Sequence, residues 1–129
     1  MFDHEKLRVS QYSLDFIEWI GNLIDEIPEK ISACRHLDEA STSISLNIAE
    51  GNGKFTTKDR CKYFDISRGS ALECAGCLDV LVRRKKARKE RILEGKQLLN
   101  DIVSMLIGLI KSNSNRTFEP EIEYGIDRK

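Results

Sequence analysis

The chain is poor in residues that break helices, since its 129 residues include only two prolines and eight glycines. It also lacks an uninterrupted apolar run of about 18 residues, so no segment is predicted to span a membrane. The first seven residues are charged and contain no signal-peptide core, and we therefore expect a cytoplasmic protein. This length and composition are typical of a single helical domain.

The four cysteines do not form a recognisable site. The spacing of Cys74 and Cys77 suggests a redox pair or a zinc site, but both fall well inside a predicted helix, away from the helix N-terminus that stabilises a thiolate. A zinc site needs four ligands, and only Cys34, His36 and Cys61 could add to this pair, without a second paired spacing. We expect reduced, buried cysteines, no metal and no cofactor.

Enzymatic motifs are also missing. The run Gly51-Asn52-Gly53-Lys54 resembles the end of a phosphate-binding loop, but position 48 is isoleucine where that loop needs its first glycine, and a helix precedes it. No catalytic triad, paired carboxylates or metal-ligand cluster is recognisable. The sequence therefore predicts a protein that is not an enzyme.

Apolar residues recur at helical spacing in four segments, which we expect to form helices. The fold class predicted is all-α, an elongated, antiparallel up-down four-helix bundle within residues 1–115. The tail, residues 116–129, has two interpretations: it is disordered, or it lies along a neighbouring subunit. The expected helices cover residues 6–26, 28 or 32 to 50, 57–84 and 89–111.

Two of these helices are apolar over a wider arc than one core needs. The apolar residues of 6–26 cover roughly 160°, and those of 89–111 cover roughly 200°. An isolated bundle would leave part of this surface exposed, and large exposed apolar surfaces mark interfaces. We therefore expect a homo-oligomer in which these two helices supply much of the contact.

A tight hairpin is predicted between the second and third helices. Gly51 is expected to end the second helix in the left-handed conformation, and Thr56 with Asp59 resembles a capping box that starts the third. Glu50 stands unfavourably at the negative end of a helix dipole. Its candidate partners are Arg68 and the N–H groups of the next helix, and the alternative is a solvated surface side chain.

Small residues on both helices of this hairpin predict close packing between them, in preference to a bound ligand. The third helix contributes Gly69, Ser70, Ala71, Ala75 and Gly76. Facing them we expect Ala40, Ser41, Ser43 and Ser45.

The hairpin resembles the four-helix-bundle family of 23S ribosomal RNA intervening-sequence proteins, and more distantly the accessory variability determinant of retroelements. The resemblance covers most of residues 7–111 and implies a bundle of RNA-related function with homopentameric members. Asp38 and Glu39 precede Ala40 where family members often carry basic residues, which argues against an RNA contact there. The residues that carry the resemblance are Ser43-Ile44, Asn47-Ile48-Ala49-Glu50-Gly51 and Arg68-Gly69-Ser70-Ala71-Leu72-Glu73.

Charge is distributed unevenly although the net charge is zero. Residues 1–53 hold 4 basic and 10 acidic side chains (net −6), residues 54–91 hold 12 and 5 (net +7), and residues 92–129 hold 5 and 6 (net −1). Such asymmetry is a reason to consider binding to nucleic acid or to an acidic partner, and it could equally serve contact between subunits through opposite faces. The run from 83 to 91 has two interpretations: a solvated helix end favoured by the dipole, or a patch that neutralises phosphates.

The sequence thus predicts a non-catalytic, homo-oligomeric bundle that binds structured RNA. The alternative is a protein-interaction scaffold, such as an accessory subunit of a nucleic-acid enzyme like a reverse transcriptase. The candidate RNA-binding residues are Lys58, Arg60, Lys62 and Arg68 on one surface, and Arg83, Arg84, Lys85, Lys86, Arg88 and Lys89 on another.

Overall fold

A computed structural model describes residues 3–114, apart from the side chain of Lys6, and this part of the chain contains helices and no strand. The prediction of an all-α helical bundle is confirmed for it. The expectation for the tail after residue 115 lies outside the described residues. The elements are η1 (Asp3–Lys6), α1 (Arg8–Glu26), α2 (Ser32–Asn52), α3 (Thr57–Arg83), η2 (Glu90–Ile92) and α4 (Leu93–Asn113).

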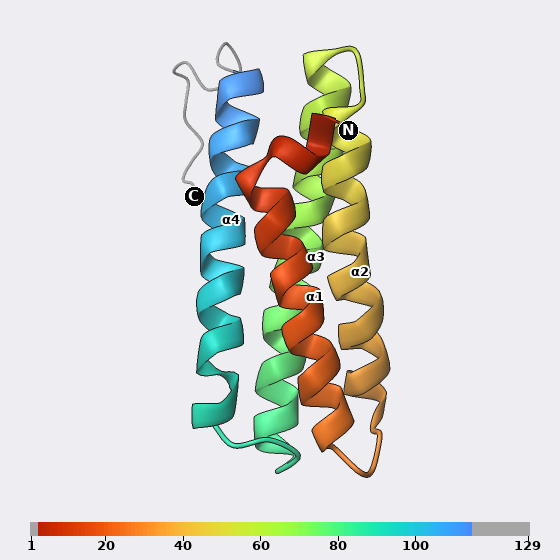
Figure 1. Cartoon of the computed structure of the whole chain (residues 1–129), viewed down its shortest axis with the longest axis vertical. Coiled ribbons are helices and arrows are strands. Elements are labelled where there is room, and N and C mark those ends of the chain that lie inside the picture. Colours follow the sequence, from red (N-terminus) through yellow and green to blue (C-terminus); the bar gives the residue numbers. More distant parts are fainter. Residues whose placement is uncertain (1–2, 115–129) are drawn as a thin grey trace.

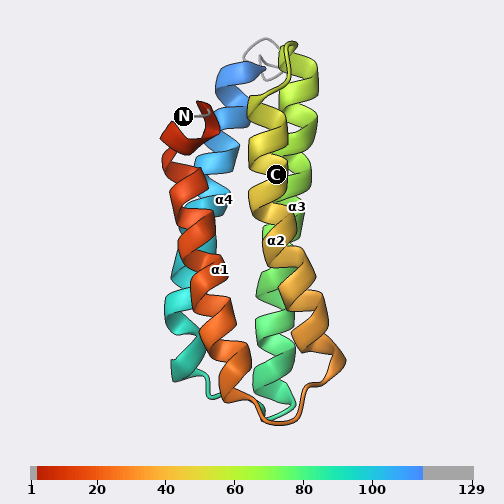
Figure 2. The ribbon, with the colours of Figure 1, turned by 45° about the vertical axis from the view of Figure 1, so that its right-hand side comes forward.

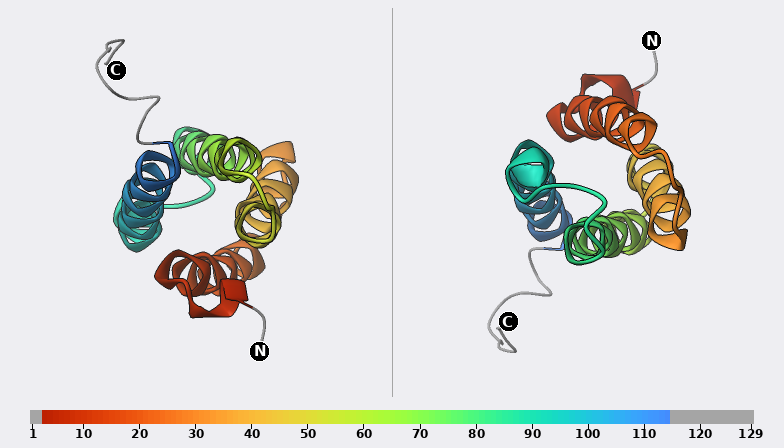
Figure 3. Two further views of the ribbon diagram at one scale, coloured as in Figure 1. Left: turned by 90° about the horizontal axis from the view of Figure 1, so that it is seen from above. Right: turned by 90° about the horizontal axis from the view of Figure 1, so that it is seen from below.

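The four α-helices lie side by side along the long axis, with their connections at alternate ends (Figure 1). Viewed along the axis they follow one another around a square, so that α1 neighbours α2 and α4 (Figure 3). Figure 2 shows the α1–α4 side and the α2–α3 side of the bundle next to each other. Contact is most extensive between α2 and α3 and least extensive between α1 and α4. None of the described helices is long and apolar enough to cross a membrane.

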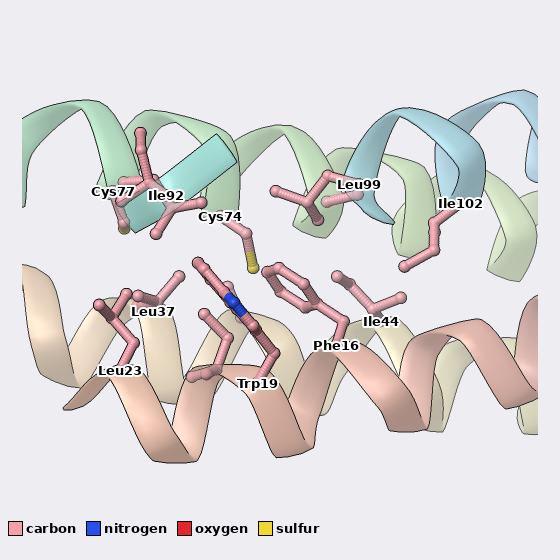
Figure 4. Packing of buried hydrophobic residues seen from close by; sticks show 14 of the residues in the cluster. Phe16, Trp19, Leu23, Leu37, Ile44, Cys74, Cys77, Ile92, Leu99 and Ile102 are labelled. Carbon is pink, nitrogen blue, oxygen red and sulfur yellow. The ribbon is translucent and has the colours of Figure 1, made fainter. Parts of the chain in front are cut away.

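The core fills the space between the helices because each helix turns one apolar stripe inward. In α2, Leu37, Ile44 and Ile48 follow one another at spacings of seven and four and are fully buried. Figure 4 shows Phe16 and Trp19 of α1 pointing toward Cys74 of α3. The largest fully buried side chains are Phe16, Ile20, Leu23, Ile27, Leu37, Ile44, Ile48, Phe64, Leu78, Leu81, Ile102 and Leu106.

In the hairpin between α2 and α3, the predicted role of Gly51 is wrong. Gly51 does not end α2 in the left-handed conformation: the helix continues to Asn52, and none of the glycines in residues 3–114 has a positive φ. Instead Gly51 is buried against α3. A Cβ at this position would stand 2.9 Å from Cε1 of Phe64 and 3.1 Å from Cβ of Tyr63, so a larger residue would not fit. Glycine at position 51 therefore permits close approach of α3, and the C-cap of α2 is Gly53.

The start of α3 follows the predicted cap. Thr56 is the N-cap residue, and its hydroxyl accepts a hydrogen bond from the backbone N–H of Asp59 at 3.1 Å. This bond satisfies one of the N–H groups that the first turn leaves without a partner. Arg68 is not the partner of Glu50, since it binds Asp65 at 2.9 Å. Glu50 is an exposed surface side chain, as the alternative interpretation expected, and forms an ion pair with Lys54 at 3.0 Å.

A line of small polar side chains joins α2 to α3. The hydroxyls of Ser43 and Ser70 lie 2.8 Å apart, and Nδ2 of Asn47 donates to Oγ of Ser43 at 3.0 Å. Farther along, the buried Ser67 donates to the carbonyl of Ile44 at 2.8 Å. Small residues thus allow two helices to approach and hydrogen-bond directly, as predicted for Ser43 and Ser70.

Gly69 and Gly76 do not take part in this contact, although they were predicted to. Both are exposed, and a Cβ at either position would meet nothing within 4 Å. Leu72 and Glu73 lie on the same exposed side of α3. The close contact is made instead by residues one helical face away, among which Ala71 is fully buried.

Candidate nucleic-acid interface

The α3–α4 connection turns sharply without glycine or proline because Lys85 adopts a left-handed conformation, with φ of 61°. The N–H of Lys86 reaches the carbonyl of Leu81 at 2.8 Å, and the N–H of Lys85 reaches the carbonyl of Val82 at 3.0 Å. This pair of bonds is the Schellman motif, in which glycine usually occupies the left-handed position. A lysine in that position carries backbone strain.

Replacing Lys85 with glycine is therefore expected to raise the free energy of unfolding by about 0.5–1 kcal/mol. Glycine relieves the left-handed strain, and the greater freedom of the unfolded chain removes part of that gain. Urea unfolding measures the change, and Lys85→Ala is the control, since it removes the charge but keeps the strain. A lower stability for Lys85→Gly than for Lys85→Ala would contradict this account of the turn.

Two cations of the connection are held by carboxylates from the end of α1 and the loop that follows it. Arg91 donates from Nε and Nη2 to the two carboxylate oxygens of Glu26, at 2.8 Å each, and its guanidinium lies 5.3 Å from the ring centre of Trp19. Lys86 pairs with Glu29. The hydrogen bond from Arg91 lowers the pKa of Glu26, and that from Lys86 lowers the pKa of Glu29. These pairs hold the connection against the end of α1 and the loop after it. Lys86 is therefore less available for binding phosphate than predicted.

The other predicted cations of the connection are exposed and form no ion pair with any side chain within residues 3–114. Glu90 is the single acidic residue between positions 83 and 91. These unpaired cations are Arg83, Arg84, Lys85, Arg88 and Lys89.

Two surface pockets flank the connection, and these cations line them. One, of about 640 Å³, is lined by Arg83, Arg84 and Lys89 over an apolar floor that includes Ile92. The other, of about 620 Å³, is lined by Lys85, Arg88 and Lys89 and also by the carboxylates of Glu26 and Glu90. The structure therefore gathers the predicted cations of this run at one end of the bundle, around two hollows.

The second predicted surface lies toward the other end of the bundle, and one of its four cations is paired with a carboxylate. Arg68 is bound to Asp65, and the ammonium of Lys62 lies 5.8 Å from the ring centre of Tyr63. Lys58 is exposed without an ion pair in the described part of the chain. The two predicted surfaces are thus separate, because α3, about 40 Å long, runs between them.

Arg60 belongs to the interior of the hairpin more than to its surface. Its Nη1 donates to the carbonyl of Asn52 at 2.7 Å, its Nη2 to Oδ1 of Asn52 at 3.1 Å, and its Nε to Oδ1 of Asn113 at 3.0 Å. Its guanidinium also lies 5.8 Å from the ring centre of Phe64. Arg60 therefore ties the α2–α3 connection to the end of α4.

Phe55 was not among the predicted residues, yet it is fully exposed at the tip of the α2–α3 connection. A signal was present in the sequence. Phe55 precedes the N-cap Thr56, a position whose apolar side chain usually packs against the fourth residue of the helix. That residue is Arg60, so the usual apolar partner is missing.

The cysteines are free thiols. Cys34, Cys74 and Cys77 are buried, and burial raises the pKa of Cys74 to about 12. A thiol with so high a pKa carries no appreciable thiolate at neutral pH and is a poor nucleophile. Among the residues that the structure describes, no group of three or more histidine, cysteine or acidic side chains could hold a metal ion.

The comparisons with known proteins agree with this architecture. The family described as "23S rRNA-intervening sequence protein" matches residues 5–108. A crystal structure of a protein of unknown function from the S23 ribosomal protein family of Bacteroides thetaiotaomicron VPI-5482 is similar in fold, with a TM-score of 0.76 and 24% sequence identity, over 80% of this chain and 98% of that chain. A search of curated proteins found no match. The family match spans most of the bundle, and the chain therefore belongs to the 23S rRNA-intervening sequence protein family.

Proposed function

We propose that this protein is a non-catalytic, homo-oligomeric bundle that binds structured RNA through the end of the molecule formed by the α3–α4 connection. The observation that carries this proposal is the group of five exposed cations at that end, which have no ion-pair partner within residues 3–114: Arg83, Arg84, Lys85, Arg88 and Lys89.

The alternative, a solvated end of α3, explains fewer of the cations between residues 83 and 91 than a phosphate-binding surface does. The dipole of α3 favours cations in its last turn, which holds Arg83. Here Lys86 and Arg91 already have carboxylate partners, and Lys96 at the start of α4 pairs with Asp79 at 2.7 Å. The remaining five cations line two hollows and form no ion pair with a described residue. Phosphate groups that such a surface neutralises release their counterions.

Self-association is supported by large apolar side chains left exposed on all four helices. They include Leu14 on α1 and Ile107 on α4, the two helices whose apolar arcs are wider than one core needs. Exposed apolar side chains that form a contiguous patch mark protein interfaces. This exposure also supports the second candidate, a scaffold for a protein partner such as a nucleic-acid enzyme.

Binding of a folded 23S ribosomal RNA fragment, measured as a function of salt, tests the RNA proposal. In the test variant the five unpaired cations are replaced, with glycine at Lys85 and alanine at the others. Each phosphate that the variant no longer neutralises is expected to reduce the dependence of log K on log salt by roughly 0.7–0.9, hence by about 4 in total.

A matched control removes five cations elsewhere: Arg35, Lys54, Lys58, Lys62 and Arg68. It is expected to leave the salt dependence nearly unchanged, and light scattering would verify the oligomer mass of both variants. RNA binding that survives the first variant, or falls equally in the control, would rule out a specific role for the α3–α4 end.

A further inference from the structure

The seam between α3 and α4 leads from the end of α4 to the α3–α4 connection, which lies at the opposite end of the bundle (Figure 1). Lys96 and position 114, where α4 has just ended, are 18 residues apart, about five helical turns, so both lie on one side of α4. Lys96 pairs with Asp79 of α3, and this side is therefore the one next to α3. Both residues of that pair line the pocket of about 640 Å³ at the connection, so the seam ends in that pocket.

Large apolar side chains remain exposed along this seam. Leu72 lies 11 residues after Cys61 and seven before Asp79, about three and two helical turns, so the three share one side of α3. Cys61 and Asp79 both contact α4 directly, which places Leu72 beside α4 as well. Ile107 lies 11 residues after Lys96, on the side of α4 next to α3. The exposed apolar side chains of the seam and its pocket are Leu72 (52%), Val80 (44%), Leu93 (57%) and Ile107 (39%).

The segment that follows α4 alternates between apolar and acidic residues. Four acids and no cation fall within residues 117–127, and the cations Arg116, Arg128 and Lys129 stand outside this stretch. Such alternation is typical of an extended chain that covers an apolar surface with one face and presents its polar groups on the other. The apolar positions are Phe118, Pro120, Ile122, Tyr124 and Ile126, and the acidic positions are Glu119, Glu121, Glu123 and Asp127.

This segment is long enough to follow the seam to its end. The helix α4 has 21 residues and is about 30 Å long. An extended chain spans about 3.3 Å per residue, so residues 115–124 reach about 33 Å. Extended back along α4, the segment would bring Phe118 near Ile107, and Tyr124 near Leu93 at the pocket.

We propose that residues 117–127 lie extended along the α3–α4 seam of their own subunit and end in the pocket at the connection. Their apolar side chains then cover those left exposed along the seam. Their carboxylates lie beside Arg83, Arg84 and Lys89, three unpaired cations that line the pocket. Asp79, the single carboxylate in that lining, is already bound to Lys96, so the lining keeps its positive charge.

Docking of the segment regulates the proposed RNA site. The three unpaired cations of the pocket are among the five proposed above to bind RNA phosphates, so the segment and RNA compete for them. The competition rests on the proposed function, whereas the docking itself rests on the seam, the pocket and the alternating sequence. Self-association then depends on apolar residues exposed outside the seam: Leu14, Leu46, Phe55 and Ile66.

Carbodiimide crosslinking of the full chain tests the docking without RNA. This reagent joins a carboxylate to an amine where the two are in contact. We expect mass spectrometry to find an acid of residues 119–127 joined to Lys89 or Lys96, with the pair of Lys96 and Asp79 as the internal reference. When heavy-isotope-labelled and unlabelled chains are refolded together, each joined pair should be wholly labelled or wholly unlabelled. Absence of this crosslink, or a majority of pairs with mixed label, would overturn the proposal.

The variant Leu72→Ser separates docking along the seam from loose attraction between charges. It removes an exposed apolar side chain of the seam, so the yield of the crosslink should fall by about half or more. Ile66→Ser is the matched control, because Ile66 is exposed on another side of α3, and it should leave the yield unchanged. Equal yields from the two variants would show that the segment does not lie along the seam.

Neutralising the acids of the segment in the full chain tests the competition. At low salt the neutralised variant is expected to bind the folded 23S fragment about fivefold more tightly than the unchanged chain. A control that neutralises four exposed acids elsewhere changes the net charge equally and should gain about twofold at most. The test variant carries Glu119→Gln, Glu121→Gln, Glu123→Gln and Asp127→Asn, and the control carries Asp15→Asn, Glu18→Gln, Asp38→Asn and Glu73→Gln.

The outcomes distinguish failure of this inference from failure of the proposed function. Equal gains in the test variant and the control would refute the competition. RNA binding without the crosslink would leave the RNA site in place and refute the docking. Failure of every variant to bind RNA would refute the proposed function, and the crosslink would still decide whether the segment docks.

Discussion

Replacing Gly95 with alanine is expected to lower the free energy of unfolding by about 2 kcal/mol. A Cβ at this position of α4 would stand 2.2 Å from Cζ3 and 2.3 Å from Cη2 of Trp19, far inside contact distance. Overpacking of this kind typically costs about 1–3 kcal/mol or more, and the better helix propensity of alanine returns up to about 1 kcal/mol.

The indole has little room to move aside. Trp19 is 7% exposed, stacks on Phe16 at a centroid distance of 5.9 Å, and is covered by Arg91. Its Nε1 has no hydrogen-bond partner among the described residues, so packing alone holds the ring in place. Displacing the ring would therefore disturb Phe16 in the centre of the core.

Gly76→Ala is the matched control for this substitution, since its Cβ would meet nothing within 4 Å. It is expected to stabilise the protein by up to about 1 kcal/mol, through helix propensity alone. Trp19 is the single tryptophan, so its fluorescence during urea unfolding reports on both variants. Equal stability of the two alanine variants would show that the approach of Gly95 to Trp19 is not tight.

Replacing Arg60 with alanine is expected to cost about 2–3 kcal/mol of stability. The guanidinium joins the start of α3 to the ends of α2 and α4, and hydrogen bonds from a charged donor contribute about 1.5–3 kcal/mol. Its removal leaves the partly buried carbonyl of Asn52 and the amide oxygen of Asn113 without their donor.

Arg60→Lys separates charge from geometry. Lysine keeps the charge but lacks the planar fork that reaches Asn52 and Asn113 together, so it should restore less than half of the stability that alanine removes. Arg68→Ala is the surface control, because the exposed pair with Asp65 is expected to contribute no more than about 1 kcal/mol. Thermal unfolding of the three variants measures these differences, and full rescue by lysine would contradict the proposed role of Arg60.

The helices and their inward faces could be predicted because they depend on local patterns. Apolar residues at helical spacing indicated the four helices, and Thr56 with Asp59 identified the start of α3. Helical periodicity and helix capping involve residues within a few turns of each other, so the short segment that contains those residues is enough to predict them.

The roles of the glycines could not be predicted in the same way. Gly51 and Gly95 permit close approach, of Phe64 and Trp19 respectively, while Gly69 and Gly76 face open space. All four lie in helices. Which of them meets a neighbouring side chain depends on the positions of other helices, which the local pattern does not contain.

For the candidate RNA site, the sequence by itself determined that cations concentrate between residues 83 and 91. Only the tertiary structure decided which of them are available, because the carboxylates that bind Lys86 and Arg91 come from Glu29 and Glu26, 57 and 65 positions away. Likewise, only the fold engaged Arg60 within the hairpin and left Phe55 uncovered by the described residues. Composition sets the number of charged side chains. Which of them form ion pairs depends on contacts between residues far apart in the sequence, and these contacts exist only in the folded chain.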